Sequence, residues 1–224
     1  MTGEPFERRA SGEPDVSGFL HRPARPSGDG IVLTHGAGGD CRMPLLVALA
    51  GAFAGAGVTA LRCDLPFRQQ RASGPPAPQG AARDRAGLRH AVRALRKSGP
   101  GRVFLGGQSY GGRMASMLVA EEPSLAAALL LLSYPLHPPG RPDDVRAAHL
   151  PRLRVPALFV HGDADPFGAP AEIDEARALV PAPTALVVVR GGHDLGWSRG
   201  KGDPSLPARV VTALRDLAPA GHRS

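Results

Sequence analysis

Four short polar clusters in the chain carry the residue types that nucleophilic hydrolysis needs. Ser109 is the candidate nucleophile, His193 the candidate base and Asp165 the candidate acid. A serine hydroxyl is a poor nucleophile at neutral pH, so it needs a base within hydrogen-bond reach and an acid that fixes the tautomer of that base. The order serine, acid, histidine is one of those in which such sites occur. The clusters are HGAGG at 35–39, GQSYG at 107–111, HGDAD at 161–165 and GGH at 191–193.

The segment around Ser109 predicts a sharp turn between a strand and a helix. It follows the apolar run Val103-Phe104-Leu105 and precedes a helix-like stretch, and this context exposes a serine as a nucleophile. Gly107 and Gly111 leave the space that side chains would fill in such a strained turn. The alternative is a glycine-rich loop with an incidental serine.

Hydrolysis of a carbonyl compound also needs two backbone donors for the oxyanion, and the chain offers two candidates. They are the N–H of Tyr110, directly after the nucleophile, and the N–H of Ala37, in the loop after an earlier strand. Gly38 and Gly39 would let that loop approach a substrate closely. A phosphate-binding loop is the alternative, but no Gly-Lys-Ser/Thr follows and G-x-G-x-x-G is absent.

Two aspartates compete for the role of the acid. Asp163 lies nearer the expected strand end, whereas Asp165 is followed by Pro166, which sets a turn; we favour Asp165, in part because of the family resemblance given below. Asp194 is adjacent to the base, so we expect it to cap its own loop.

The remaining histidines and the two cysteines do not indicate a metal site. His35 and His161 each end a strand before a glycine and are more typical of structural histidines. No pair has H-E-x-x-H spacing, and Cys41 and Cys63 are too far apart for a zinc pattern, so we expect neither a metal nor another cofactor.

Composition limits the function classes. The formal charge of +7 comes almost entirely from arginine, and arginines recur at helical spacing over 83–96, which is typical of a solvated helix face. An anionic partner is the alternative, but with 4% aromatic residues and no recognised module we expect no nucleic-acid binding. No signal peptide or membrane helix is evident, so we expect no membrane partner, and the sparse, widely spaced Cys41 and Cys63 predict a reducing, cytoplasmic compartment. The oligomeric state is not predicted.

Short apolar runs alternate with amphipathic stretches, a pattern that predicts an α/β fold with a mostly parallel, doubly wound sheet covered by helices on both faces. We expect one domain over 1–224, with 1–15 and 218–224 poorly ordered, loops at 72–80 and 134–144, and no lid domain within 136–154. The four polar clusters then fall at the carboxyl ends of strands, where open parallel sheets bind ligands. The expected strands are 16–21, 30–35, 59–63, 102–106, 127–133, 155–161 and 184–190, and the expected helices are 44–56, 82–97, 109–121, 170–179 and 206–217.

Five ordered motifs between about residues 30 and 217 together resemble the small, lidless α/β-hydrolases related to dienelactone hydrolase. They are HGAGG, GGQSYGGR, SYPLHPPG, HGDADPFG and GGHDLG. The resemblance is greatest to a bacterial subgroup of predicted hydrolases that shares its domain with a subunit of the animal nonspecific-lethal acetyltransferase complex. The chain departs from true dienelactone hydrolases in having serine where they have a cysteine nucleophile.

This resemblance implies an α/β-hydrolase fold, a triad of Ser109, Asp165 and His193, and an oxyanion hole formed by Ala37 and Tyr110. The expected activity is that of a serine hydrolase on a small carboxylic ester or thioester, through an acyl-enzyme. We expect Gly38, His137 and Phe167 to contact that substrate. The alternative is a non-catalytic domain of the same fold that binds an acidic partner.

Overall fold

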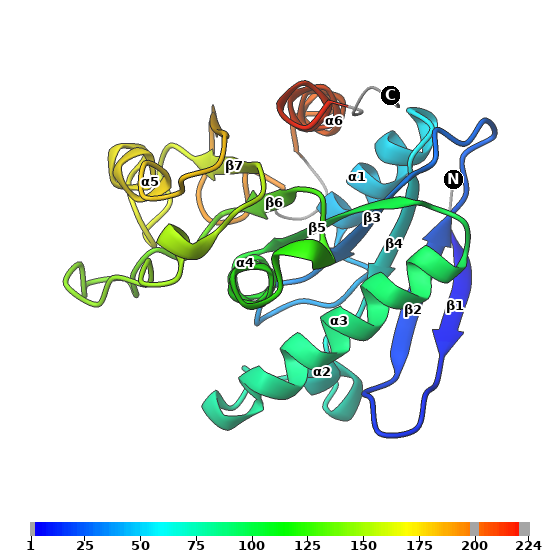
Figure 1. Cartoon of the computed structure of the whole chain (residues 1–224). Helices are drawn as coiled ribbons and strands as arrows, with labels where there is room; N and C mark the ends of the chain where they lie inside the picture. The colour runs from blue at the N-terminus through cyan, green and yellow to red at the C-terminus, as the bar shows by residue number, and fades with distance from the viewer. Residues whose placement is uncertain (1–2, 198–201, 220–224) are drawn as a thin grey trace.

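The computed structural model describes residues 3–197 and 202–219, and its centre is an eight-stranded sheet (Figure 1). The strand order is β1-β2-β4-β3-β5-β6-β7-β8. β1 and β2 are antiparallel to their neighbours, and all other pairs are parallel. The strands are β1 (Glu4–Arg8), β2 (Val16–His21), β3 (Asp29–Thr34), β4 (Thr59–Cys63), β5 (Arg102–Gln108), β6 (Leu129–Leu132), β7 (Ala157–Gly162) and β8 (Thr184–Val189). The predicted mostly parallel sheet is therefore confirmed.

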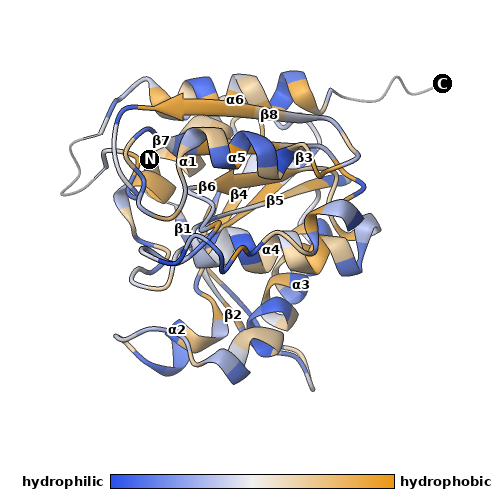
Figure 2. Cartoon of the chain, turned by 90° about the vertical axis from the view of Figure 1, so that its left-hand side faces the viewer, coloured by the Kyte–Doolittle hydropathy of each residue, from blue (hydrophilic) through white to orange (hydrophobic). Residues whose placement is uncertain are grey.

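Helices cover both faces of the sheet because successive strand residues point to opposite sides and both sides are apolar. Ile31 and Leu33 pack with α1 (Pro44–Gly55) and α6 (Leu206–Leu217) on one face. Val32 packs on the other face with α3 (Ala81–Lys97), α4 (Tyr110–Glu121) and α5 (Pro170–Arg177). Figure 2 shows the apolar strands β3, β4 and β5 beneath helices that carry hydrophilic stretches.

The predicted strands and helices agree with the observed bounds to within two residues, but β1 and four short helical elements were not predicted. The largest of these helical elements is α2 (Pro66–Gln70), a helix of 5 residues directly after β4. Pro78–Gly80 forms a 3-10 turn inside the segment expected to lack regular structure. Further 3-10 turns are Pro123–Leu125 and Leu150–Arg152.

The expectation that residues 1–15 are poorly ordered is wrong for 4–8. Residues Glu4 to Arg8 pair with β2 as an antiparallel edge strand, and Phe6, 4% exposed, packs into the core. At the other end, Arg102 donates to the carbonyls of Ala218 and Pro219, whereas 220–224 lie outside the described residues.

The segment from β6 to β7 contains the 3-10 turn Leu150–Arg152 but no α-helix among its residues, all of which the structure describes. It therefore holds no lid domain, as predicted. None of the helices within 3–197 and 202–219 combines the length and the apolar character that crossing a bilayer requires.

Candidate active site

Ser109 lies at a sharp turn between β5 and α4, as its sequence context predicts. Its φ of 49° and ψ of −117° are unfavourable for a residue with a side chain and cost roughly 1–3 kcal/mol. Two backbone hydrogen bonds hold the turn: the Ser109 N–H donates to the Leu132 carbonyl (2.8 Å), and the Arg113 N–H donates to the Ser109 carbonyl (2.9 Å). The strain is therefore supported by β6 and by the first turn of α4.

The two glycines that flank Ser109 are required by close backbone packing. A Cβ on Gly107 would lie 2.7 Å from the Gly111 carbonyl carbon. A Cβ on Gly111 would collide with the His35 carbonyl oxygen and lie 2.7 Å from Thr34 Cγ2. Real Cβ atoms do not approach other atoms this closely, so both positions exclude a side chain, as expected from the sequence.

A continuous chain of hydrogen bonds joins Ser109, His193 and Asp165. His193 Nε2 lies 2.7 Å from Ser109 Oγ, and Nδ1 lies 2.9 and 2.8 Å from the two carboxylate oxygens of Asp165. Because a carboxylate only accepts, His193 carries its proton on Nδ1, which leaves Nε2 to accept the Ser109 proton. This is the arrangement in which an imidazole can act as a general base toward serine.

The environment of Asp165 keeps its carboxylate in place. The side chain is 0% exposed, and Oδ1 also accepts the N–H of Phe167 (2.9 Å). Asp163 instead accepts the Gly191 N–H (2.9 Å), so it ties the end of β7 to the loop that carries His193. Of the two candidate acids, only Asp165 contacts the base.

Neighbouring residues hold the backbone of the His193 loop. Gln108 Nε2 donates to the His193 carbonyl (3.2 Å), and Asp194 Oδ1 accepts the Gly196 N–H (2.9 Å). The second contact is the loop cap expected for Asp194.

The loop after β3 lies beside the nucleophile. A Cβ on Gly36 would lie 3.3 Å from Ser109 Cβ, so the peptides of this loop run directly past the serine. His35 Nε2 accepts the Leu65 N–H (3.1 Å), and Nδ1 therefore carries the proton and donates to the Gly36 carbonyl (2.8 Å). Burial lowers the pKa of His35, which keeps the ring neutral and preserves this arrangement.

Orientation of the Gly36 carbonyl also orients the Ala37 N–H. The C=O and N–H of one trans peptide point in opposite directions, so the bond from His35 to the Gly36 carbonyl turns the Ala37 N–H the other way. In the described part of the chain neither this N–H nor that of Tyr110 donates a hydrogen bond. Neither expected donor is therefore taken up by an acceptor among the described residues.

The second structural histidine, His161, is 0% exposed and lies beneath the triad. Its Nε2 is 2.8 Å from the Gly168 carbonyl and 3.7 Å from an Asp165 carboxylate oxygen. Burial lowers the pKa of His161. It therefore supports the loop after β7 rather than acting on a substrate.

The structure places the three expected substrate contacts at different distances from the triad. The Phe167 ring stacks on the His193 ring, with centroids 4.1 Å apart. His137 is one step further away: its N–H donates to the Phe167 carbonyl (3.1 Å), and its Nε2 lies 3.4 Å from Glu172 Oε1. Gly38 is exposed, and a Cβ there would meet no atom within 4 Å.

The described residues offer neither a metal-binding cluster nor a low-pKa thiol. No group of three or more His, Cys, Asp or Glu side chains within the described ranges could hold a metal ion. Both cysteines are buried thiols, and burial raises the pKa of Cys41 to about 12 and raises that of Cys63 as well.

Comparison with known proteins assigns the fold family. Residues 28–213 match the family model described as alpha/beta hydrolase domain. The chain belongs to this α/β-hydrolase family. Its eight-stranded, mostly parallel sheet with helices on both faces is the α/β-hydrolase fold, and residues 3–197 and 202–219 form no lid domain.

Solved structures of other α/β hydrolases superpose on almost the whole chain. An α/β serine hydrolase homologue from Coxiella burnetii is 19% identical, with a TM-score of 0.76 over 96% of this chain and 98% of that chain. A lidless serine hydrolase from Xanthomonas campestris is 18% identical (TM-score 0.72, 96% of both chains). Dienelactone hydrolase from Anabaena variabilis is 23% identical (TM-score 0.69, 96% of this chain and 97% of that chain).

A match to a curated protein covers a much smaller region. Over 75 residues, or 33% of this chain, the α/β hydrolase is 33% identical to the polyketide synthase ThaQ from Burkholderia thailandensis. The matched segment is 4% of that protein.

Two residues near the site were not identified from the sequence. Arg68, on α2, is 8% exposed and donates to carbonyls of the loop after β3, and Asp84, on α3, is 1% exposed and accepts the Tyr110 hydroxyl proton (2.7 Å). One signal was present, because Pro66 follows an expected strand closely and proline favours the first position of a helix.

Proposed function

We propose that this α/β hydrolase is a serine hydrolase that cleaves a small carboxylic ester or thioester. The observation that carries the proposal is the hydrogen-bond chain from Ser109 Oγ through His193 to the buried Asp165 carboxylate. The family match and the similarity to solved structures of serine hydrolases support it.

In the proposed first half-reaction, His193 takes the proton of Ser109 while Oγ attacks the substrate carbonyl carbon. The N–H groups of Ala37 and Tyr110 bind the oxyanion, and each contributes about 3 kcal/mol to lowering the barrier. His193 then gives the proton to the leaving alcohol or thiol as its bond to the acyl carbon breaks. The product of this step is an ester of Ser109.

In the second half-reaction, water replaces the leaving group. His193 takes a proton from a water molecule, whose oxygen attacks the acyl carbon of the Ser109 ester. Collapse of the second oxyanion returns the proton to Ser109 and releases a carboxylic acid. The proposed chemistry uses protein groups and water throughout.

A fluorophosphonate probe tests the proposal, because it reacts covalently with an activated serine. We expect labelling of the wild type that is lost in Ser109→Ala and falls at least 100-fold in rate in His193→Ala. Ser205→Ala, which changes another hydroxyl outside the site, is the matched control and should label like the wild type. A folded wild type that is neither labelled nor active on 4-nitrophenyl esters would contradict the proposal and favour the non-catalytic alternative.

The same assay narrows the substrate class. Under the proposal, rates on 4-nitrophenyl esters of increasing acyl length report the size of the acyl site. Acetyl thioesters measured in parallel separate esterase from thioesterase activity, since the leaving group differs and the acyl group does not.

A further inference from the structure

The short helix α2 contacts both segments that supply the proposed oxyanion donors. One donor, the Ala37 N–H, comes from the loop after β3, and the other, the Tyr110 N–H, begins α4. The two segments follow β3 and β5, which pair directly up to Thr34 and Gly107, and beyond this pairing a second set of contacts joins them. Leu65, Phe67 and Arg68, at the start of α2, make the contacts that do so.

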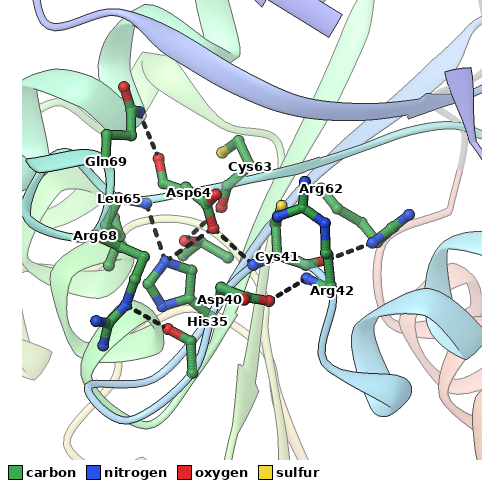
Figure 3. Close-up of polar contacts among 12 residues, drawn as sticks. His35, Asp40, Cys41, Arg42, Arg62, Cys63, Asp64, Leu65, Arg68 and Gln69 are labelled. Atoms are coloured by element: carbon green, nitrogen blue, oxygen red, sulfur yellow. Dashed lines mark hydrogen bonds and ion pairs between the residues drawn. The ribbon is translucent and has the colours of Figure 1, made fainter. Parts of the chain in front are cut away.

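Arg68 holds the Ala37 side of the site. Its Nη2 donates to the Ala37 carbonyl (2.8 Å) and its Nε to the Gly39 carbonyl (2.8 Å). Since His35 holds the Gly36 carbonyl, the peptides before and after Ala37 are both fixed, and with them the direction of the Ala37 N–H. Figure 3 shows His35, Leu65 and Arg68 side by side in this network.

Every hydrogen bond of the Arg68 guanidinium with a described residue is donated to a backbone carbonyl. The guanidinium also donates to the carbonyls of Arg71 (3.1 Å) and Gly74 (3.2 Å), while no carboxylate of the described residues forms an ion pair with it. Burying an arginine without an acidic partner is costly, and four carbonyl acceptors replace its lost hydration. The fork of guanidinium donors can reach several carbonyls at once, which a lysine ammonium cannot match in geometry.

Asp84 holds the Tyr110 side of the site. Its Oδ1 accepts the Phe67 N–H (3.0 Å), and its Oδ2 accepts the Tyr110 hydroxyl proton (2.7 Å). The Phe67 ring packs edge-on against His35 and Tyr110, with centroid distances of 5.6 and 5.7 Å. A single carboxylate therefore ties the first turn of α2 to the first residue of α4.

We propose that α2 anchors the oxyanion hole, with Arg68 and Asp84 as positioning residues that keep the two amides at a fixed separation. The inference rests on the proposed function. Donors stabilise an oxyanion only when they are held in place before the charge develops, because reorganising them would consume the energy gained. Neither side chain takes part in the chemistry, so loss of either lowers the rate of acylation rather than ground-state binding.

The test compares Arg68→Met with Arg42→Met. Arg42 lies near the same loop, is exposed, and packs its guanidinium 5.1 Å from the centre of the Phe19 ring, so it is the matched control. We expect Arg68→Met to lower kcat on 4-nitrophenyl acetate by about 10- to 100-fold with KM changed less than about threefold. Arg42→Met should keep the wild-type kcat.

The inhibition constant of a trifluoromethyl ketone should not change if Arg68 only stabilises the fold, so it tests the positioning role separately. The adduct of this ketone with Ser109 carries an oxyanion, so its inhibition constant should rise by the same factor as kcat falls. Arg68→Lys should lie between the wild type and Arg68→Met. If Arg68→Met does not fold, Arg68→Lys and Tyr110→Phe, which removes only the bond to Asp84, should each lower kcat about 3- to 10-fold in folded protein.

Two outcomes separate the inference from the proposed function. If the wild type is labelled by a fluorophosphonate and folded Arg68 and Tyr110 variants keep both kcat and the inhibition constant, the anchor is refuted and the hydrolase is not. A lower melting temperature with unchanged kinetics also refutes it. If the wild type is neither labelled nor active, the proposed function is refuted, and the inference that rests on it is refuted as well.

Discussion

His149 should make the fold sensitive to acid, and His149→Gln should remove that sensitivity. The side chain is 7% exposed, and its Nε2 lies 2.7 Å from Ser116 Oγ. Because the Ser116 hydroxyl donates to the Arg113 carbonyl (2.9 Å), Nε2 of His149 must be the donor in this pair. Burial first, and then the charges of Arg113 and Arg152, lowers the pKa of His149 from 6.5 to about 4.

The size of the effect follows from this pKa shift. An unfolded histidine takes up a proton below pH 6.5, whereas folded His149 resists protonation down to about pH 4. The depressed pKa therefore stabilises the folded state above pH 6.5, and this contribution is lost as the pH falls from 6.5 to 4. Between pH 7 and pH 5 the loss amounts to about 2 kcal/mol.

Urea unfolding at pH 7 and pH 5 measures this loss. The glutamine in His149→Gln can donate to Ser116 Oγ but does not titrate, so the variant should lose about 2 kcal/mol less than the wild type between the two pH values. All other titrating groups are common to both proteins and cancel in the comparison. Equal losses in wild type and variant would show that His149 is protonated normally in the folded state.

Three further variants, one of them paired with the control Gly51→Ala, test the site and its support. Asp165→Asn should lower kcat about 10³-fold, because His193 loses the acceptor that fixes its tautomer, with little change in the urea midpoint. Gly111→Ala should destabilise the protein by about 1–3 kcal/mol through the clash with the His35 carbonyl, whereas Gly51→Ala in α1, with open space around its Cβ, should raise stability by up to about 1 kcal/mol. Phe167→Leu should lower kcat/KM about 2- to 12-fold by removing the ring stacked on His193; an unchanged value would show that the stacking does not orient the base.

The triad residues were predictable because topology, rather than fine geometry, brings them together. β5, β7 and β8, whose carboxyl ends carry Ser109, Asp165 and His193, are parallel strands, so those ends meet at one edge of the sheet. The side-chain period of the strands and the glycines at their ends are local signals. Which of the two aspartates contacts His193 depends on the path of the turn after β7, and the strand pattern left that choice open.

The elements that were not predicted carry little local signal, and the one present is Pro66 at the start of α2. β1 contains one buried residue, Phe6, among charged neighbours, and its pairing with β2 is decided by tertiary packing. At 5 residues, α2 is too short to display a helical period. Both elements depend on packing against chain segments that are distant in the sequence.

The many arginines of the chain show why the residues that support the site could not be identified from the sequence either. The arginines of α3 only partly form the solvated helix face expected of them: Arg83 and Arg93 are exposed, and Arg93 pairs with Glu13 at 3.1 Å, which contributes little to stability, whereas Arg85, Arg89 and Arg96 are half-buried. Arg68 has the same side chain but is buried against backbone carbonyls. The amino-acid type does not distinguish a surface arginine from a buried one, because a guanidinium is buried only where the fold supplies enough hydrogen-bond acceptors. In a chain rich in arginine, a residue that holds the loop after β3 is therefore recognised from its acceptors, whereas a motif marks only the residues expected to react.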